Sequence, residues 1–146
     1  MLLGVFKVQE TRVKDIMIPR SNMVIIKKNS SINEILPLII KSSHSRFPVI
    51  LENKDEIIGI LLAKDLLKFI DKDSSSFNID EIIRPSVIIP ETKKLNVLLS
   101  EFKSGRNHLA VVVDEYGGVS GLITIEDVLE QIVGDIIDEH DTVLIN

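Results

Sequence analysis

Two side chains that could bind a sugar phosphate, Thr124 and Asp127, lie three residues apart in the stretch GLITIED (121–127). An apolar stretch ends here and a helical pattern begins, so the unpaired N–H groups of a helix start are close by. A carboxylate accepts two hydrogen bonds from a ribose diol, and a threonine hydroxyl beside such N–H groups can hold phosphate. The same residue types also cap helices without any ligand. The spacing leaves both interpretations open.

An earlier copy of this turn, GILLAKD (59–65), has the glycine and the aspartate 62 residues upstream but carries Leu62 in place of the threonine. Three further matches between the two parts of the chain are these: 47–50 on 109–112 at the same offset, Ile32 on Leu95 at an offset of 63, and DIMIP (15–19) on EIIRP (81–85). Matches that recur in one order indicate a diverged duplication. The copy with Thr124 and Asp127 is the more intact of the two.

Each copy predicts the order strand, helix, strand, strand, helix. The first copy places these elements at 23–26, 30–43, 47–51, 57–62 and 64–70, and the second at 86–89, 93–105, 109–114, 119–124 and 126–137. Ser31 is predicted to cap the start of the first long helix, and Gly105 to cap the end of its counterpart. Pro37 is expected near the first turn of its helix or at a kink. DEYGG (114–118) predicts a hairpin turn with an exposed Tyr116.

This pattern predicts an α/β fold of the α+β type, with two β-α-β-β-α repeats. A small three-stranded sheet cannot bury both faces alone, so we expect the two sheets to pack against each other around a pseudo-twofold axis. Two related clefts would then lie between the repeats. The predicted divisions are an N-terminal extension (1–11), repeat 1 (12–73), a serine-rich linker (74–78), repeat 2 (79–141) and a C-terminal tail (142–146).

The composition excludes several classes of protein. The chain has 146 residues, of which 45% are hydrophobic and only 4% aromatic, with a net charge of −5 and no cysteine. The acidic balance argues against a nucleic-acid partner, and the lack of cysteine excludes disulfides and thiolate metal sites. No stretch is long and apolar enough for a membrane span, and the start does not match a signal peptide. We expect a cytoplasmic protein that does not itself insert into a membrane.

Two other groups of residues could carry chemistry but have simpler explanations. His44 and Ser45 are adjacent in an extended segment, where neighbours do not face each other, so a nucleophile–base pair is not expected. The tail contains five residues that could be drawn as a metal site: Asp135, Asp138, Glu139, His140 and Asp141. Acidic runs are usually solvated, so we expect no metal site made by protein alone.

Several motifs in order resemble one family. The paired units resemble a tandem of CBS domains, a Bateman module, whose nucleotide signature is similar to GLITIED (121–127). The segments RVKDIMIPRSNMV, HSRFPVI, GILLAKDLL and VVVDEYGGVSGLITIEDVLEQIVGDI resemble the CBS region of CorC/HlyC-type magnesium and cobalt efflux proteins. The likeness runs from about Arg12 to Asp141, which is nearly the whole chain.

The resemblance implies an adenine nucleotide, AMP or ATP, in the cleft between the repeats. By this resemblance, Asp127 would bind the ribose and Thr124 the ribose or the phosphate, with Met23 and Val24 on either side of the adenine. Arg46 and His108 stand where cationic side chains could meet phosphate, although a surface ion pair and a half-buried strand histidine are the simpler interpretations. The remaining implied contacts are Pro19, Ser45, Phe47 and Pro48.

A second, weaker site would lie in the other cleft by the same resemblance. It would pair Asp65 with Pro85, Ser86, Val87 and the segment 107–110, which includes Leu109. Leu62 offers no hydroxyl there, so this cleft lacks half of the chemistry of the first.

Three functions remain open at this point. The leading hypothesis is a regulatory module, not an enzyme, that reports nucleotide or magnesium-nucleotide level to the membrane domain of an efflux protein, the chain being a piece of a longer protein. Magnesium would arrive with ATP phosphates. The alternative is a structural dimerisation module without a physiological ligand, and homodimers are expected in either case. The last is a nucleotide hydrolase with Glu126 or Asp127 as base, for which the sequence supplies no metal or cationic clamp.

Overall fold

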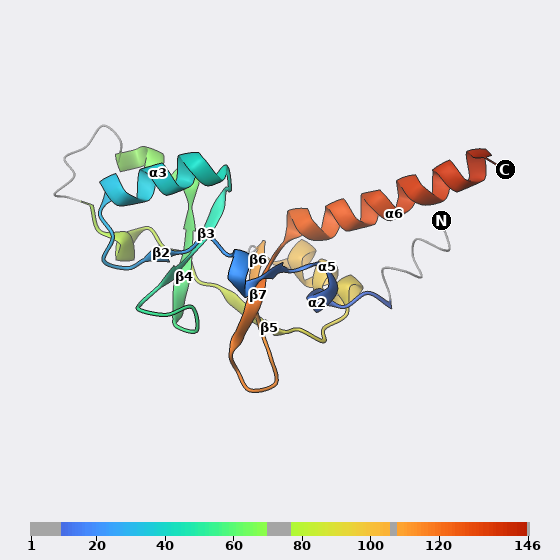
Figure 1. Ribbon diagram of the computed structural model, residues 1–146, viewed down its shortest axis with the longest axis horizontal. Coiled ribbons are helices and arrows are strands. Elements are labelled where there is room, and N and C mark those ends of the chain that lie inside the picture. The colour runs from blue at the N-terminus through green and yellow to red at the C-terminus, as the bar shows by residue number, and fades with distance from the viewer. Residues whose placement is uncertain (1–9, 70–76, 106–107, 146) are drawn as a thin grey trace. The chain divides into compact units, whose positions relative to one another are not determined.

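The computed structural model describes residues 10–69, 77–105 and 108–145 (Figure 1). It divides the chain into two compact units: unit 1 consists of Met1–Ser21 and Val87–Asn146, and unit 2 of Asn22–Ser86. Each unit has its own sheet and its own apolar core. Most of the expected N-terminal extension (1–9), residues 74–76 of the expected linker, and Asn107 lie outside the described residues.

Unit 2 contains a three-stranded sheet in the order β2-β3-β4, formed by Ile26–Lys27, Arg46–Ile50 and Ile57–Leu62. β2 runs parallel to β3, and β3 antiparallel to β4. Helix α3 (Ile32–Ser42) joins β2 to β3, and the short helix α4 (Ala63–Leu66) follows β4 directly and continues as the 3-10 turn η2 (Leu67–Phe69). A further 3-10 turn, η4 (Ile79–Glu81), lies shortly before the unit ends at Ser86. The core residues are Ile26, Ile32, Ile35, Phe47, Val49, Leu61, Leu66 and Ile79.

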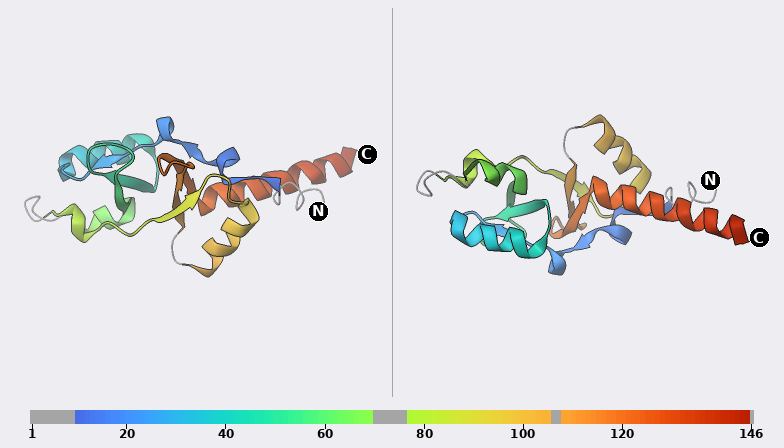
Figure 2. Two further views of the ribbon diagram at one scale, coloured as in Figure 1. Left: turned by 90° about the horizontal axis from the view of Figure 1, so that it is seen from below. Right: turned by 90° about the horizontal axis from the view of Figure 1, so that it is seen from above.

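Unit 1 contains a four-stranded sheet in the order β1-β7-β6-β5, formed by Ile18–Pro19, Val119–Thr124, Leu109–Val113 and Val87–Pro90. Helix α2 (Val13–Ile16) precedes β1, the 3-10 turn η1 (Arg20–Asn22) follows it, and α5 (Leu95–Ser104) joins β5 to β6. The long helix α6 (Ile125–Ile145) begins where β7 ends and contacts β7, α5 and α2. Figures 1 and 2 show its second half continuing past the other helices of unit 1.

The predicted order of strand, helix, strand, strand, helix is confirmed in both copies. Ser31 caps α3 as predicted: its hydroxyl accepts from the Glu34 N–H at 3.3 Å, and the Glu34 carboxylate accepts from the Ser31 N–H at 3.4 Å. This is a capping box, which satisfies two N–H groups of the helix start at once. Gly105 caps α5, donating its N–H to the Glu101 carbonyl. Pro37 lies inside α3, beyond its first turn.

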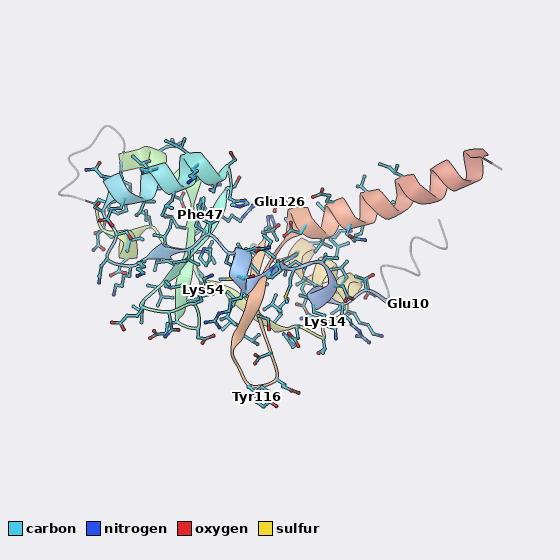
Figure 3. All side chains as sticks on the ribbon, viewed as in Figure 1. Glu10, Lys14, Phe47, Lys54, Tyr116 and Glu126 are labelled. Carbon is cyan, nitrogen blue, oxygen red and sulfur yellow. The ribbon has the colours of Figure 1, made fainter. Side chains whose placement is uncertain are left out.

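The ends of several elements differ from the predictions. β2 begins only at Ile26, the α-helical part of α4 ends at Leu66, and α6 runs on to Ile145 instead of ending at 137. The hairpin turn after β6 forms as predicted, with Gly117 at a φ of +84° and Tyr116 exposed at its tip (Figure 3). Asp114 holds this turn by accepting the N–H groups of Tyr116 and Gly118.

The overlay of 47–50 on 109–112 was wrong by one residue. Arg46 lies opposite Leu62 in unit 2, and Leu109 lies opposite Thr124 in unit 1, so Arg46 and Leu109 are the equivalent pair. The correct offset for this strand is therefore 63, the same as for the long helices. Both strands are almost wholly buried, so no alternation of polar and apolar residues marked the register.

One strand was not predicted at all: β1, which pairs antiparallel with β7 and sets Ile18 opposite Leu122. Unit 2 has a matching bridge between Arg84 and Ile60, whose backbone groups exchange two hydrogen bonds of 2.8 Å. The matched segments DIMIP and EIIRP thus take equivalent places in the two units. Each segment precedes the first strand of one repeat and pairs with the sheet of the other, so the compact units cut across the two sequence repeats.

Candidate functional site

The turn from β7 into α6 brings Thr124 and Asp127 into direct contact. The Thr124 N–H donates to Oδ2 of Asp127 at 3.0 Å, and the Asp127 N–H donates to Oγ1 of Thr124 at 3.2 Å. This reciprocal pair is a capping box, so the helix-capping interpretation of these two residues is confirmed. The two side chains fix each other at the start of α6.

Capping does not use up the chemistry of this turn. A carboxylate has about four acceptor positions, and the cap occupies one of them on Asp127. Thr124 and Asp127 are both partly exposed, and α6 is long enough for a well-developed positive end. The turn therefore offers a fixed, charged acceptor beside a helix start, which suits a ligand that carries both hydroxyl groups and an anionic group.

Two more of the predicted residues belong to unit 1, and one of them, His108, lies against the same turn. The Ile125 N–H donates to the carbonyl of His108 at 2.9 Å, which places His108 beside the start of α6. The His108 side chain is half-buried. Pro19 in β1 lies opposite Gly121, on the strand that leads into the turn, and is exposed. Unit 1 thus brings His108 together with Thr124 and Asp127, whereas Pro19 lies further back along β7.

The other predicted residues belong to unit 2. Met23 is buried, and Val24 packs against the core of the unit. Ser45 is exposed, and its carbonyl accepts the Ala63 N–H at 2.9 Å, as the His108 carbonyl does for Ile125. Arg46, the first residue of β3, is half-buried. Phe47 is fully buried in the core with its ring edge-on to His44, and Pro48 is also buried, so both can offer a ligand mainly backbone atoms.

The first-repeat turn, from β4 into α4, is built differently. Asp65 is only 6% exposed and accepts two hydrogen bonds from one guanidinium, Nε of Arg84 at 3.0 Å and Nη2 at 3.1 Å. Arg84 was not among the residues predicted for either site. Pro85 and Ser86, two of the residues expected beside Asp65, follow Arg84 in the same unit, whereas Val87 and Leu109 belong to unit 1.

Glu126 is exposed on the first turn of α6 (Figure 3). Among the described side chains, which exclude Asp135 and everything from Asp138 onward, no three or more His, Asp or Glu residues gather to hold a metal ion. No helix within the described residues is long and apolar enough to cross a membrane.

A family model described as the CBS domain matches residues 13–72 and, a second time, residues 79–134. The chain belongs to the CBS-domain family. Its two repeats form a CBS pair, as the motifs predicted.

Among curated proteins, the CBS pair is similar to the magnesium and cobalt efflux protein CorC of Escherichia coli (strain K12), with 55% identity over 141 residues. The match covers 97% of this chain and 48% of that protein, so the chain spans about half the length of the curated relatives it matches. These relatives are named as efflux proteins, which agrees with the prediction that the chain is not an enzyme.

Solved structures give the same picture. The CBS domain of a bacterial CNNM/CorC family Mg²⁺ transporter in complex with ATP is 38% identical, with a TM-score of 0.85 over 91% of this chain and 94% of that one. A CBS-domain pair with bound AMP from Klebsiella pneumoniae is 30% identical, with a TM-score of 0.74 over 84% of this chain and 98% of that one. The likeness to CorC-type proteins seen in the motifs is confirmed.

Proposed function

We propose that this CBS pair is the regulatory module of a magnesium and cobalt efflux protein and that it binds an adenine nucleotide, AMP or ATP. The observation that carries the proposal is the Thr124–Asp127 turn. It presents a carboxylate with free acceptor capacity, held rigidly at the start of a long helix. The relatives solved with ATP and with AMP support the choice of ligand.

In this proposal the nucleotide lies in a cleft between the repeats, as the likeness to other CBS pairs suggests. Asp127 accepts the ribose hydroxyls, and Thr124 and the N–H groups of α6 meet the ribose or the phosphate. His108 and Arg46 are the candidate phosphate contacts. The other contacts are Pro19, Met23, Val24, Ser45, Phe47 and Pro48, the last two through backbone atoms.

A bound nucleotide regulates only if it binds two arrangements of the two units with different affinity. The receiver of the signal in this proposal is the membrane domain of the parent protein, at the cytoplasmic face of the plasma membrane. Magnesium enters as part of a Mg²⁺–ATP complex, since that ion keeps most of its waters and needs few protein carboxylates.

The second candidate function, a structural dimerisation module, is favoured by one observation. Helix α6 carries a stripe of large apolar side chains that are 43–52% exposed: Leu129, Val133, Ile136 and Ile137. Their spacing places them on one face of the helix, the arrangement of a helix that packs against a partner. A homodimer formed through this face is compatible with nucleotide binding and is part of our proposal.

Isothermal titration with AMP, ADP and ATP, each with and without Mg²⁺, tests the proposal. The decisive variant is Asp127→Asn, which keeps an acceptor for the Thr124 N–H but removes the charge. Glu130→Gln is its matched control, because it removes the same charge from an exposed position one turn further along α6.

We expect wild type and Glu130→Gln to bind at least one adenine nucleotide alike, and Asp127→Asn to lose at least tenfold in affinity. No binding of any nucleotide by wild type would refute the proposed function and leave the dimerisation module. Equal binding by Asp127→Asn would show that the ligand does not use this turn.

A further inference from the structure

The two equivalent aspartates of the CBS pair have different partners. Both oxygens of Asp65 are bonded to the guanidinium of Arg84, and the Asp65 side chain is 8% exposed. Asp127 accepts the Thr124 N–H through one oxygen, and no ion pair joins it to any described residue. The repeated carboxylate is thus paired with an arginine in one copy and, among the described residues, with no cation in the other.

This difference arises because each sheet also pairs with a short segment of the other repeat, and these two segments differ in sequence. Arg84 pairs with Ile60, and Ile18 pairs with Leu122, so these two residues hold equivalent places. Their carbonyls also lie over equivalent glycines: a Cβ added to Gly59 would come within 2.9 Å of the Arg84 oxygen, and one added to Gly121 would strike the Ile18 oxygen. One place holds an arginine and the other an isoleucine, which cannot pair with a carboxylate.

We propose that Arg84 silences the first-repeat turn as a nucleotide site and thereby limits the CBS pair to one nucleotide per chain. The Arg84 fork takes two of the roughly four acceptor positions of the Asp65 carboxylate. Because the Asp65 side chain is only 8% exposed, a vicinal diol would have to displace the fork to reach the remaining ones. Bidentate, charge-assisted pairs are the strong ones among hydrogen bonds, and a neutral diol cannot replace the lost charge. The ligand would also leave the guanidinium without its partner. The inference rests on the proposed function and adds to it the residue that sets how many nucleotides one chain binds.

Substitutions at positions 18 and 84 test the inference in both directions, by adding an arginine to one turn and by removing it from the other. Ile18→Arg supplies the Asp127 turn with the missing cation, and Ile18→Leu is the apolar control. Leu62→Thr restores the hydroxyl of the first-repeat turn while keeping Arg84, and Leu62→Thr/Arg84→Ile restores the hydroxyl and removes the cation. Each variant is titrated with the nucleotide that wild type binds most tightly, and its melting temperature without ligand reports whether it is folded.

We expect one site in wild type, at least a tenfold loss of affinity in Ile18→Arg, and no more than a twofold change in Ile18→Leu. Leu62→Thr should still bind one nucleotide, whereas Leu62→Thr/Arg84→Ile should bind two, the second being lost when Asp65→Asn is added. Ile18→Arg adds a pair and removes none, so it tests the inference even if the double variant does not fold.

The outcomes separate the two proposals. A wild type that binds no nucleotide overturns the proposed function and this inference with it. A wild type that binds one nucleotide, together with a folded double variant that still binds one or an Ile18→Arg variant that binds normally, overturns the inference alone. Two sites in wild type, one of them lost in Asp65→Asn, would also overturn it.

Discussion

At the scale of single residues, the turn at Thr124 and Asp127 shows that capping and ligand binding are not exclusive. The cap takes one acceptor position of the carboxylate and one of the hydroxyl, and it holds both groups still. A ligand that meets them loses little entropy from side-chain ordering, because the cap has already ordered them.

The capping role predicts a stability effect that is independent of any ligand. Asp127→Ala removes the acceptor of the Thr124 N–H and should lower the free energy of unfolding by about 1 kcal/mol, the usual cost of a lost cap. Asp127→Asn keeps an oxygen in that place and should cost much less. Urea unfolding of the ligand-free protein measures both. Equal destabilisation by the two variants would show that charge, and not the cap hydrogen bond, stabilises this turn.

The site could be predicted from sequence only in part. Thr124 and Asp127 stood out because their types and spacing match a chemical task and because the turn occurs twice. Arg84 gave no such signal, since its partner Asp65 is 19 residues away and the bond depends on how a distant segment meets the sheet. The one clue was the match of EIIRP with DIMIP, which places an arginine where the other copy has an isoleucine.

At the scale of elements, the order of strands and helices followed from periodicity, and most of the errors were at ends. The two-residue strand β1 was missed because it is too short for any pattern, and it forms only because β7 offers an edge. The overlay of 47–50 failed by one residue because the two strands are buried along almost their whole length. Patterns indicate how a segment folds better than they indicate what it pairs with.

Close packing of β1 on β7 predicts opposite effects of two glycine substitutions. A Cβ at Gly121 would strike the Ile18 carbonyl, so Gly121→Ala should displace β1 and destabilise the protein by about 1–3 kcal/mol. Gly134 lies inside α6 with no atom within 4 Å of an added Cβ, so Gly134→Ala should stabilise by about 0.5–1 kcal/mol. Thermal unfolding of both variants measures this, and a Gly121→Ala variant as stable as wild type would contradict it.

At the scale of the whole molecule, the exposed apolar stripe of α6 predicts self-association. Val133→Glu places a charge at the middle of the stripe and should raise the dissociation constant of the homodimer at least about tenfold, since a central interface residue commonly contributes more than 1 kcal/mol. Val97→Glu makes the same change at an exposed valine of a different helix, α5, and is the control. Sedimentation equilibrium measures the dissociation constant. A dimer unaffected by Val133→Glu would place the interface elsewhere, and a monomeric wild type would contradict the proposed homodimer.

Because β1 pairs with β7, which lies on the other side of unit 2 in the sequence, the two units cannot be completed at the same time during synthesis. Unit 2 is one uninterrupted segment and is complete once Ser86 has left the ribosome. Unit 1 is made in two segments, and the first, with α2 and β1, waits until β7 and α6 emerge. Translation adds about 5–20 residues per second, so Ile18 waits about 5–20 s for Leu122. Through that interval β1 has no strand to pair with. The segment with α2 and β1 is made before the whole of unit 2, yet β1 is among the last strands of the CBS pair to find its partner.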